Sequence, residues 1–369
     1  MKRLLALAAA ALALAPAAHA GAPPVLATAY LVEDARTGEV LAASNAHARR
    51  PIASITKLMT VLVALQHHRL SDVVTVDRRA AVVGESSAHL RAGERLTVRD
   101  LVKAALIQSA NDAAAALALS VSPDFASFAA LMNEQAAKLG LRDTHFVRPD
   151  GLDAAGEYSS AADVTALARV LMRTRFVRET VRRRTDMIAG GRTLHTWDDL
   201  LTQLPQTIGV KTGHTSAAGW CQVAAVRGRG VTVYATLLGS PTRGQRNDDL
   251  ESLLLWGLSR FRVVDAVQAG RTYAEVQLPY GRKPLALLAR PLRVVVRVDR
   301  LLTERVVAPV RIALPVRVGA VLGRVEVRER GRLVGTRDLV ASRTINKPGL
   351  VRRLGWYAGR TLHHLAHLF

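Results

Sequence analysis

The sequence predicts an α+β protein: an antiparallel sheet flanked by helices, then a small all-β region and a C-terminal amphipathic helix. Three observations lead to this prediction. Strand-like segments stand at both ends of the first 260 residues, and helical segments lie between them. Beyond residue 261 the pattern changes to short β-branched segments separated by Gly and Pro. Residues 349–369 carry apolar and basic side chains at helical spacing.

The first 20 residues have the pattern of a secretory signal peptide. Lys2 and Arg3 precede an apolar run over residues 4–14, and residues 18–20 form a small-x-small cleavage site. A membrane-spanning anchor is the alternative, but the run is short for a span and Pro16 interrupts it. We therefore expect cleavage after residue 20 and an exported protein. No later segment is long and apolar enough to predict a span.

The next elements follow from local pattern. A hairpin is expected over residues 28–43, because two apolar runs flank a turn signal ending in Gly38. A helix should follow Ser54. Residues 97–119 are largely helical in pattern, with Thr97 as N-cap and an interruption at 109–111. Two more helices are expected over residues 125–139 and 160–174, the second capped by Ser159 or Ser160.

The end of the first 260 residues returns to strands. Strands are expected at 208–211, 220–225 and 231–239, with the last two joined by a Gly-containing turn at 227–230. A closing helix is expected over 247–260. Cys221 is the one cysteine, so it forms no internal disulfide. Its place in an alternating run favours a buried strand residue over a nucleophile.

A small β-rich domain is predicted for residues 262–345, after a larger domain over residues 21–261. Its strand-like segments are 294–296, 310–312, 325–327 and 333–334. This region holds 17 basic and 7 acidic residues, within a whole-chain formal net charge of +21. A basic balance is compatible with nucleic acid. Expected export and the scarcity of aromatic residues favour an anionic envelope surface instead, so no nucleic-acid partner is expected.

The C-terminal segment, residues 346–369, predicts an amphipathic helix that lies in a membrane interface. Trp356 and Tyr357 suit the headgroup boundary. A surface helix that packs on the β-rich domain is the alternative. The absence of acidic residues favours the anionic membrane surface. The apolar stripe is Val351, Leu354, Ala358, Leu362, Leu365 and Phe369, and the basic stripe is Arg353, Arg360, His364 and His367.

Ser54-Ile55-Thr56-Lys57 is the strongest chemical signal. If it opens a helix, Ser54 and Lys57 share a face, so the amine stands beside the hydroxyl as a base stands beside a nucleophile. The alternative is an N-cap serine followed by an exposed lysine. Lysine is rare in this chain, where arginine supplies most basic charge. Lysine can become neutral near pH 7, whereas arginine cannot, so the use of lysine at position 57 favours the catalytic interpretation.

Two further motifs extend this signal. Ser109-Ala110-Asn111 offers a second hydroxyl and an amide. Lys211-Thr212-Gly213 ends a predicted strand and offers a positive charge, a hydroxyl and a glycine that a substrate backbone could approach closely. Thr215 adds another hydroxyl. Each motif alone is weak, but their order and spacing together indicate one catalytic site. No metal-ligand spacing accompanies them, so neither a metal nor a cofactor is expected.

The three motifs resemble those of the penicilloyl-serine transferases, which include β-lactamases and penicillin-binding proteins. Longer matches resemble the type-5 low-molecular-mass D-alanyl-D-alanine carboxypeptidases, over essentially the whole mature chain. That family has a β-lactamase/transpeptidase-like domain, a small β-rich domain and an amphipathic anchor. The matching segments are Pro51-Ile52-Ala53-Ser54-Ile55-Thr56-Lys57, Gln108-Ser109-Ala110-Asn111-Asp112, Gly151-Leu152-Asp153, Tyr158-Ser159-Ser160-Ala161 and Gly209-Val210-Lys211-Thr212-Gly213-His214-Thr215.

The resemblance implies a serine D,D-peptidase that removes the terminal D-alanine from peptidoglycan stem pentapeptides. Ser54 would form the acyl-enzyme and Lys57 would accept its proton. It also implies inhibition by β-lactams and a role in cell-wall maturation and cell shape. The place of action would be the outer face of the cytoplasmic membrane, periplasmic in a two-membrane envelope.

The resemblance also assigns the remaining residues of the site. Ser109 would relay the proton to the leaving group, and Asn111 would hold Lys57 and the substrate amide. The backbone amides of Ser54 and His214 would form the oxyanion hole. The substrate would be bound by the strand residues Lys211, Thr212, Gly213, His214 and Thr215.

One segment departs from the family pattern. An Asn-x-Asn-x-Leu-Leu-like stretch is replaced by Thr196-Trp197-Asp198-Asp199-Leu200-Leu201. This change affects the expected carboxylate side of the cleft. Three rival interpretations are a β-lactamase, a D,D-endopeptidase and an inactive cell-wall-binding protein. A class A β-lactamase would need a Glu-x-x-Leu-Asn segment, which the sequence lacks. The β-rich domain argues against an endopeptidase. The presence of Ser54 and Lys57 argues against an inactive binding protein.

Overall fold

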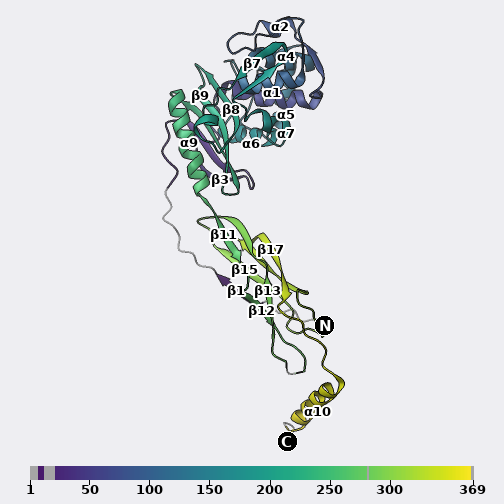
Figure 1. Ribbon diagram of the computed structural model, residues 1–369. Coiled ribbons are helices and arrows are strands. Elements are labelled where there is room, and N and C mark those ends of the chain that lie inside the picture. The colour runs from purple at the N-terminus through teal and green to yellow at the C-terminus, as the bar shows by residue number, and fades with distance from the viewer. Residues whose placement is uncertain (1–6, 12–20, 281, 367–369) are drawn as a thin grey trace. The chain divides into compact units, whose positions relative to one another are not determined.

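The structure is a computed structural model that describes residues 7–11, 21–280 and 282–366 (Figure 1). The chain forms two compact units: the first consists of residues 21–259, and the second of residues 260–366 together with residues 7–11. Most of the predicted signal peptide lies outside the described residues. Its described part, strand β1 (Leu7–Ala11), pairs antiparallel with β15 (Leu302–Val307) of the second unit. Cleavage after residue 20 stays a prediction.

The first unit is built on an antiparallel sheet of order β3-β2-β10-β9-β8, which confirms the predicted α+β class. The two chain ends of the unit meet in it, because β2 and β10 are neighbours. Its strands are β2 (Ala29–Asp34), β3 (Glu39–Ser44), β8 (Thr207–Thr215), β9 (Gly219–Gly228) and β10 (Val231–Ser240).

Helices cover both faces of this sheet. Thr165 of α6 (Ala161–Leu171) hydrogen-bonds Thr236 of β10, while Gly257 of α9 (Arg243–Ser259) packs against Val233 of the same strand. Positions 233 and 236 differ in parity, so the two helices lie on opposite faces. The α9 helix begins four residues before the predicted start at 247.

The helical layer that carries the motifs follows the predicted order. The predicted N-caps are observed: Thr97 accepts a hydrogen bond from the amide of Asp100, and Ser160 from that of Asp163. Nearly all of the apolar side chains of α1 and α4 are buried in one core. The helices are η1 (Ala53–Thr56), α1 (Lys57–His67), α3 (Val98–Lys103), the π-helical η2 (Ala104–Gln108), α4 (Asn111–Val121) and α5 (Phe125–Lys138).

Several short elements were not expected from the sequence. Each is too short to show a clear hydrophobic period. They are β4 (Val73–Thr75), α2 (Arg78–Ala81), β5 (Arg95–Thr97), α7 (Arg175–Thr180), β6 (Thr185–Ile188), η3 (Ala189–Gly191), β7 (Arg192–His195) and α8 (Leu200–Gln203).

The second unit is all-β apart from its last helix and has a separate apolar core. The strand expected at residues 310–312 is absent from the described secondary structure, where Arg311 forms only an isolated bridge to Gln277. Pro309 and Pro315 flank this segment and cannot donate to a strand ladder. The remaining strands are β11 (Phe261–Val267), β12 (Thr272–Val276), β13 (Leu285–Ala289), β14 (Leu292–Arg297), β16 (Val321–Glu329) and β17 (Arg332–Ala341).

The predicted C-terminal helix is present as α10 (Leu350–Ala366). Its Leu350, Val351 and Leu354 side chains are exposed. Trp356 and Tyr357 form an aromatic cluster with Tyr280, with ring centroids 5.5 and 6.2 Å from that ring. Among the described helices, none alone has the length and apolarity to cross a bilayer. Only α4 and α5 taken together reach them, across a bend of 86°.

Candidate active site

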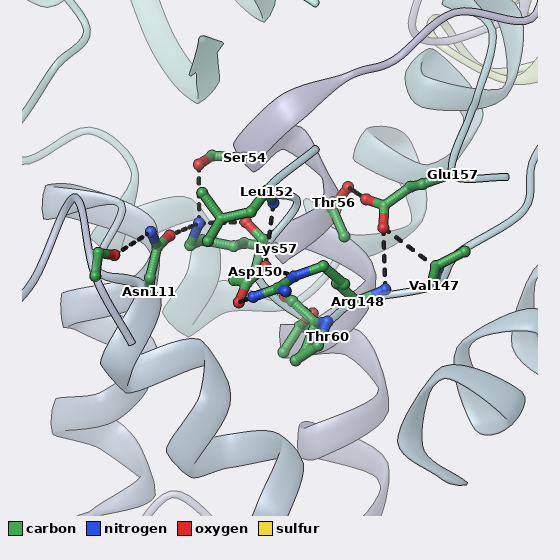
Figure 2. Close-up of polar contacts among 12 residues, drawn as sticks. Ser54, Thr56, Lys57, Thr60, Asn111, Val147, Arg148, Asp150, Leu152 and Glu157 are labelled. Atoms are coloured by element: carbon green, nitrogen blue, oxygen red, sulfur yellow. Dashed lines mark hydrogen bonds and ion pairs between the residues drawn. The ribbon is translucent and has the colours of Figure 1, made fainter. Parts of the chain in front are cut away.

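Ser54 and Lys57 meet as the sequence predicted. Ser54 lies in the 3₁₀ turn η1, which runs directly into α1, and Lys57 is the first residue of that helix. The Lys57 amine lies 2.8 Å from the Ser54 hydroxyl oxygen (Figure 2). Ser54 is not the N-cap, and Lys57 is fully buried. The alternative of a capping serine and an exposed lysine is therefore wrong.

Two further acceptors hold the Lys57 amine. It donates to the side-chain carbonyl of Asn111 at 2.7 Å and to the backbone carbonyl of Asp150 at 2.6 Å (Figure 2). Gly151, which follows, is at φ +77°, and a Cβ there would collide with the carbonyl of Ala53. The close approach of the two segments that position Lys57 thus requires glycine at 151.

Burial lowers the pKa of Lys57 to about 8, while the charges of Asp150 and Glu157 oppose the shift. A lysine of ordinary pKa is neutral in roughly one molecule in 3,000 at pH 7, whereas one of pKa about 8 is neutral in about one in ten. A neutral amine accepts a proton from the Ser54 hydroxyl instead of donating to it. This pair can therefore generate a serine nucleophile, which is the chemistry of a serine hydrolase.

The second and third motifs meet through their side chains. The Lys211 amine donates to the Ser109 hydroxyl and to the backbone carbonyl of Thr212, each at 2.8 Å. Ser109 is in the left-handed conformation at φ +62°, between η2 and α4, and so forms the expected interruption. Burial and the charge of Lys57 lower the pKa of Lys211. The positive charge expected at Lys211 from the sequence is thus opposed by its buried surroundings.

These residues border a cavity of about 320 Å³. The predicted residues in its lining are Ser54, Ser109, Asn111, Thr212, Gly213 and His214. Lys57 and Lys211 are buried behind this lining. Thr215 lies outside it, because its hydroxyl donates to the Asp153 carboxylate at 2.6 Å. Trp197, from the segment expected on the carboxylate side of the cleft, also lines the cavity. The lining residues that were not predicted from the sequence are Glu85, Ser86, Trp220, Arg243 and Arg246.

Gly213 has a structural reason that the sequence analysis did not foresee. A Cβ there would lie 2.7 Å from the carbonyl oxygen of Ile52 and 3.1 Å from the amide nitrogen of Ser54. Glycine therefore lets β8 approach the turn that carries the nucleophile. The next residue, His214, is exposed and stacks on Trp220, with ring centroids 4.0 Å apart.

Residues 196–201, which depart from the family pattern, hold two arginines at the cavity. Trp197 donates to the carbonyl of Gln108 at 3.0 Å and lines the cavity. Asp199 accepts two hydrogen bonds from Arg243, at 2.6 and 2.7 Å, and lies 3.4 Å from Arg246. Arg243 and Arg246 share one face at the start of α9. Neither arginine was predicted as a site residue, because the predicted helix begins at residue 247 and leaves both outside it.

Asp198, the other carboxylate of this segment, is buried. It accepts a hydrogen bond from Gln222 at 2.8 Å, and desolvation raises its pKa. Neither Asp198 nor Asp199 lines the cavity. Within this segment, Trp197 therefore forms part of the cavity wall, while the two carboxylates support the wall from behind.

Known proteins are similar to this chain in sequence and in fold. The family model described as D-alanyl-D-alanine carboxypeptidase matches residues 16–242. D-alanyl-D-alanine carboxypeptidase DacD of Salmonella typhimurium is 32% identical over 355 residues, covering 91% of this chain and 90% of that protein. Among solved structures, penicillin binding protein 5 from Haemophilus influenzae has a TM-score of 0.65 and 25% identity, covering 89% of this chain and 100% of that one.

A further solved structure resembles about two thirds of the chain. The Streptomyces K15 DD-transpeptidase has a TM-score of 0.62 and 30% identity, covering 65% of this chain and 100% of that one. The present chain therefore belongs to the D-alanyl-D-alanine carboxypeptidase family, a family of serine peptidases.

Proposed function

We propose that this protein is a penicillin-sensitive D-Ala-D-Ala carboxypeptidase that trims peptidoglycan stem pentapeptides through an acyl-enzyme on Ser54. The observation that carries the proposal is the buried Lys57 amine, 2.8 Å from the Ser54 hydroxyl and low in pKa. Family membership supports the reaction class and the peptidoglycan substrate. No metal or cofactor has a part in the proposed steps.

In the first step, the Ser54 oxygen attacks the carbonyl carbon of the penultimate D-alanine and Lys57 takes the hydroxyl proton. The backbone amides of Ser54 and His214 would hold the resulting oxyanion. Loss of one such donor costs roughly 3–4 kcal/mol of transition-state stabilisation. Asn111 would keep Lys57 in place and bind the substrate amide.

In the second step, the carbon–nitrogen bond breaks and terminal D-alanine leaves with a proton. Ser109, which accepts a hydrogen bond from Lys211, would relay that proton. Water then cleaves the Ser54 ester, again with Lys57 as the base, and releases the shortened peptide. A β-lactam would acylate Ser54 in the same way but hydrolyse slowly.

The cationic wall supports recognition of the substrate's terminal carboxylate. Arg243, Arg246 and Thr212 line the cavity, and Lys211 lies behind them. Since β8 is an edge strand of its sheet, its backbone can pair with an extended peptide. We assign the carboxylate to this wall, with Thr212 as a direct contact. The Thr215 hydroxyl donates to Asp153, so Thr215 would contact the substrate carboxylate only if that hydrogen bond breaks.

The test is release of D-alanine from a pentapeptide by the chain that starts at residue 21, with labelled penicillin as a second readout. Ser54→Ala should abolish both, and labelling of that variant would overturn the assignment. Lys57→Met should slow acylation at least about a hundredfold, the usual contribution of a general base. Circular dichroism checks that both variants fold.

The same assay separates the rival activities. Cleavage of cross-linked peptides without release of D-alanine from the pentapeptide would indicate an endopeptidase. Rapid hydrolysis of penicillin, rather than a long-lived adduct, would indicate a β-lactamase. The carboxypeptidase proposal predicts free D-alanine and a slowly hydrolysed adduct.

We further propose that the protein acts at the outer face of the cytoplasmic membrane, held by α10. A cell-wall substrate requires export, in agreement with the predicted signal peptide. Exposure of Leu350, Val351 and Leu354 leaves apolar surface for a lipid interface. The contacts of Trp356 and Tyr357 with Tyr280 would fix the helix against its own unit while its apolar stripe meets the membrane.

A further inference from the structure

The catalytic cavity carries charges of opposite sign. Arg243 and Arg246 line it, and they lie over the rings of Trp197 and Trp220 at 5.5 and 5.6 Å respectively. Among the described residues that line the cavity, Glu85 is the one carboxylate. A ligand of this cavity therefore meets a cationic wall and a separate anionic group.

Glu85 is held on the Asn111 side of the cavity. The Asn111 side chain donates to the carbonyl of Gly84 at 2.9 Å, and its backbone amide donates to the carbonyl of Ser86 at 2.7 Å. The Ser86 hydroxyl also donates to the carbonyl of Gln108, at 2.8 Å. Both neighbours of Glu85 are thus bonded to the residue that positions Lys57, and the segment is fixed relative to the nucleophile.

The backbone of Glu85 is strained. Its φ is +63°, a conformation that glycine adopts freely but that is uncommon for a residue with a long side chain. The flanking hydrogen bonds to Asn111 maintain it. Strained residues of this kind gather at sites where they serve a ligand.

The Glu85 carboxylate is exposed and lacks an internal partner. Within residues 7–11, 21–280 and 282–366, no hydrogen-bond donor or cation lies within bonding distance of it. The hydrogen bond to Asp150 raises the pKa of Arg148, with a smaller effect of the Glu85 charge, and Arg148 is already paired with Asp150 at 2.9 Å. The carboxylate is therefore free to pair with a cation of the substrate.

The proposed function sets the direction of the substrate, and the present inference rests on it. With the terminal carboxylate at the Arg243 and Arg246 wall and the scissile carbonyl at Ser54, the third residue of the stem extends away from that wall. We propose that Glu85 is a specificity residue that pairs with a side-chain amine on this third residue. The preferred substrates would be stem peptides with a free amine at that position.

The test compares two peptides that differ only in that charge: Nα-acetyl-Lys-D-Ala-D-Ala and its Nα,Nε-diacetyl form. Wild type should prefer the free amine. Glu85→Gln should lower kcat/KM for the free-amine peptide about two- to fivefold, the upper part of the range for an exposed ion pair, and change the diacetyl peptide by clearly less than that. Glu85→Lys should reverse the preference.

The ratio of the two kcat/KM values isolates recognition from activation of the nucleophile. Burial lowers the pKa of Lys57 and the Glu85 charge opposes this shift, so loss of that charge alters activation of the nucleophile to the same extent with both peptides. Glu157→Gln is the matched control, because Glu157 acts on Lys57 in the same way but does not line the cavity. Its ratio should equal that of wild type.

Each outcome has one meaning. If Glu85→Gln has the same ratio of kcat/KM values for the two peptides as wild type, the specificity role of Glu85 is overturned. The carboxypeptidase function would still stand. Failure of wild type to release D-alanine from either peptide would instead overturn the proposed function. A fall in the ratio for both Glu85→Gln and Glu157→Gln would show a general electrostatic effect and contradict direct pairing.

Discussion

Opposing effects set the pKa of Lys57: burial lowers it, and carboxylates from several segments oppose that shift. Burial lowers the pKa of Lys57 to about 8, and the negative charge of Glu157 opposes this shift. Desolvation raises the pKa of Glu157 itself to about 7. Glu157 accepts hydrogen bonds from the Thr56 hydroxyl at 2.8 Å and the Arg148 amide at 3.0 Å (Figure 2). It thereby joins the turn before Lys57 to the segment that leads to Asp150.

This arrangement predicts the pH dependence of acylation. The rate of penicillin acylation should rise with pH around a midpoint of about 8, because Lys57 must lose its proton to act. Glu157→Gln removes a negative charge that favours protonated Lys57, so the midpoint should move to lower pH. Stopped-flow acylation between pH 5 and pH 10 measures it.

The control for this experiment is Glu179→Gln, a surface carboxylate that pairs with Arg175 and is not among the charges acting on Lys57. It should leave the midpoint unchanged. A uniform fall in rate for Glu157→Gln without a shifted midpoint would mean that Glu157 only braces the turn.

The main residues of the site could be predicted from the sequence, because each belongs to a short motif whose residue types and spacing indicate nucleophilic catalysis. Ser54, Lys57, Ser109 and Lys211 are brought together as predicted. Glu85 and the two arginines of α9 could not be predicted, since their neighbours in space are distant in sequence. Thr215 was expected to face the substrate, and no local signal revealed its bond to Asp153.

At the level of elements, long amphipathic segments were predicted well and short ones were missed. The hairpin, the capped helices and the three strands β8, β9 and β10 show clear periods or turn signals. The pairs β4–β5 and β6–β7 have three or four residues a strand, too few for a period. Their formation depends on tertiary contacts that no local window contains.

The α10 helix carries a prediction of its own. Removal of residues 350–369 should release the protein from anionic liposomes, because the helix supplies both exposed apolar side chains and basic charge. Cosedimentation with vesicles measures the loss, and penicillin acylation in solution should be unchanged. Equal binding by the truncated chain would place the anchor elsewhere, in the basic second unit.

On the scale of the whole molecule, the two units have separate cores and all cavity-lining residues belong to the first. Residues 21–259 alone should therefore fold and be acylated by penicillin within about threefold of the longer chain, since two compact units with their own cores fold independently. Calorimetry and labelling of the fragment measure this. An unfolded fragment would show that the second unit is required for stability.

The meeting of both chain ends in one sheet has a consequence for biogenesis. Synthesis delivers the β2–β3 hairpin, Ser54 and Lys57 well before β8, β9 and β10 exist. A lone hairpin is marginally stable, so Ser54 and Lys57 stand without the edge strand β8 until the last strands of the sheet are synthesised. We therefore expect that the nascent chain does not react with penicillin. The time at which labelled penicillin first becomes covalently bound would then report when the sheet is complete.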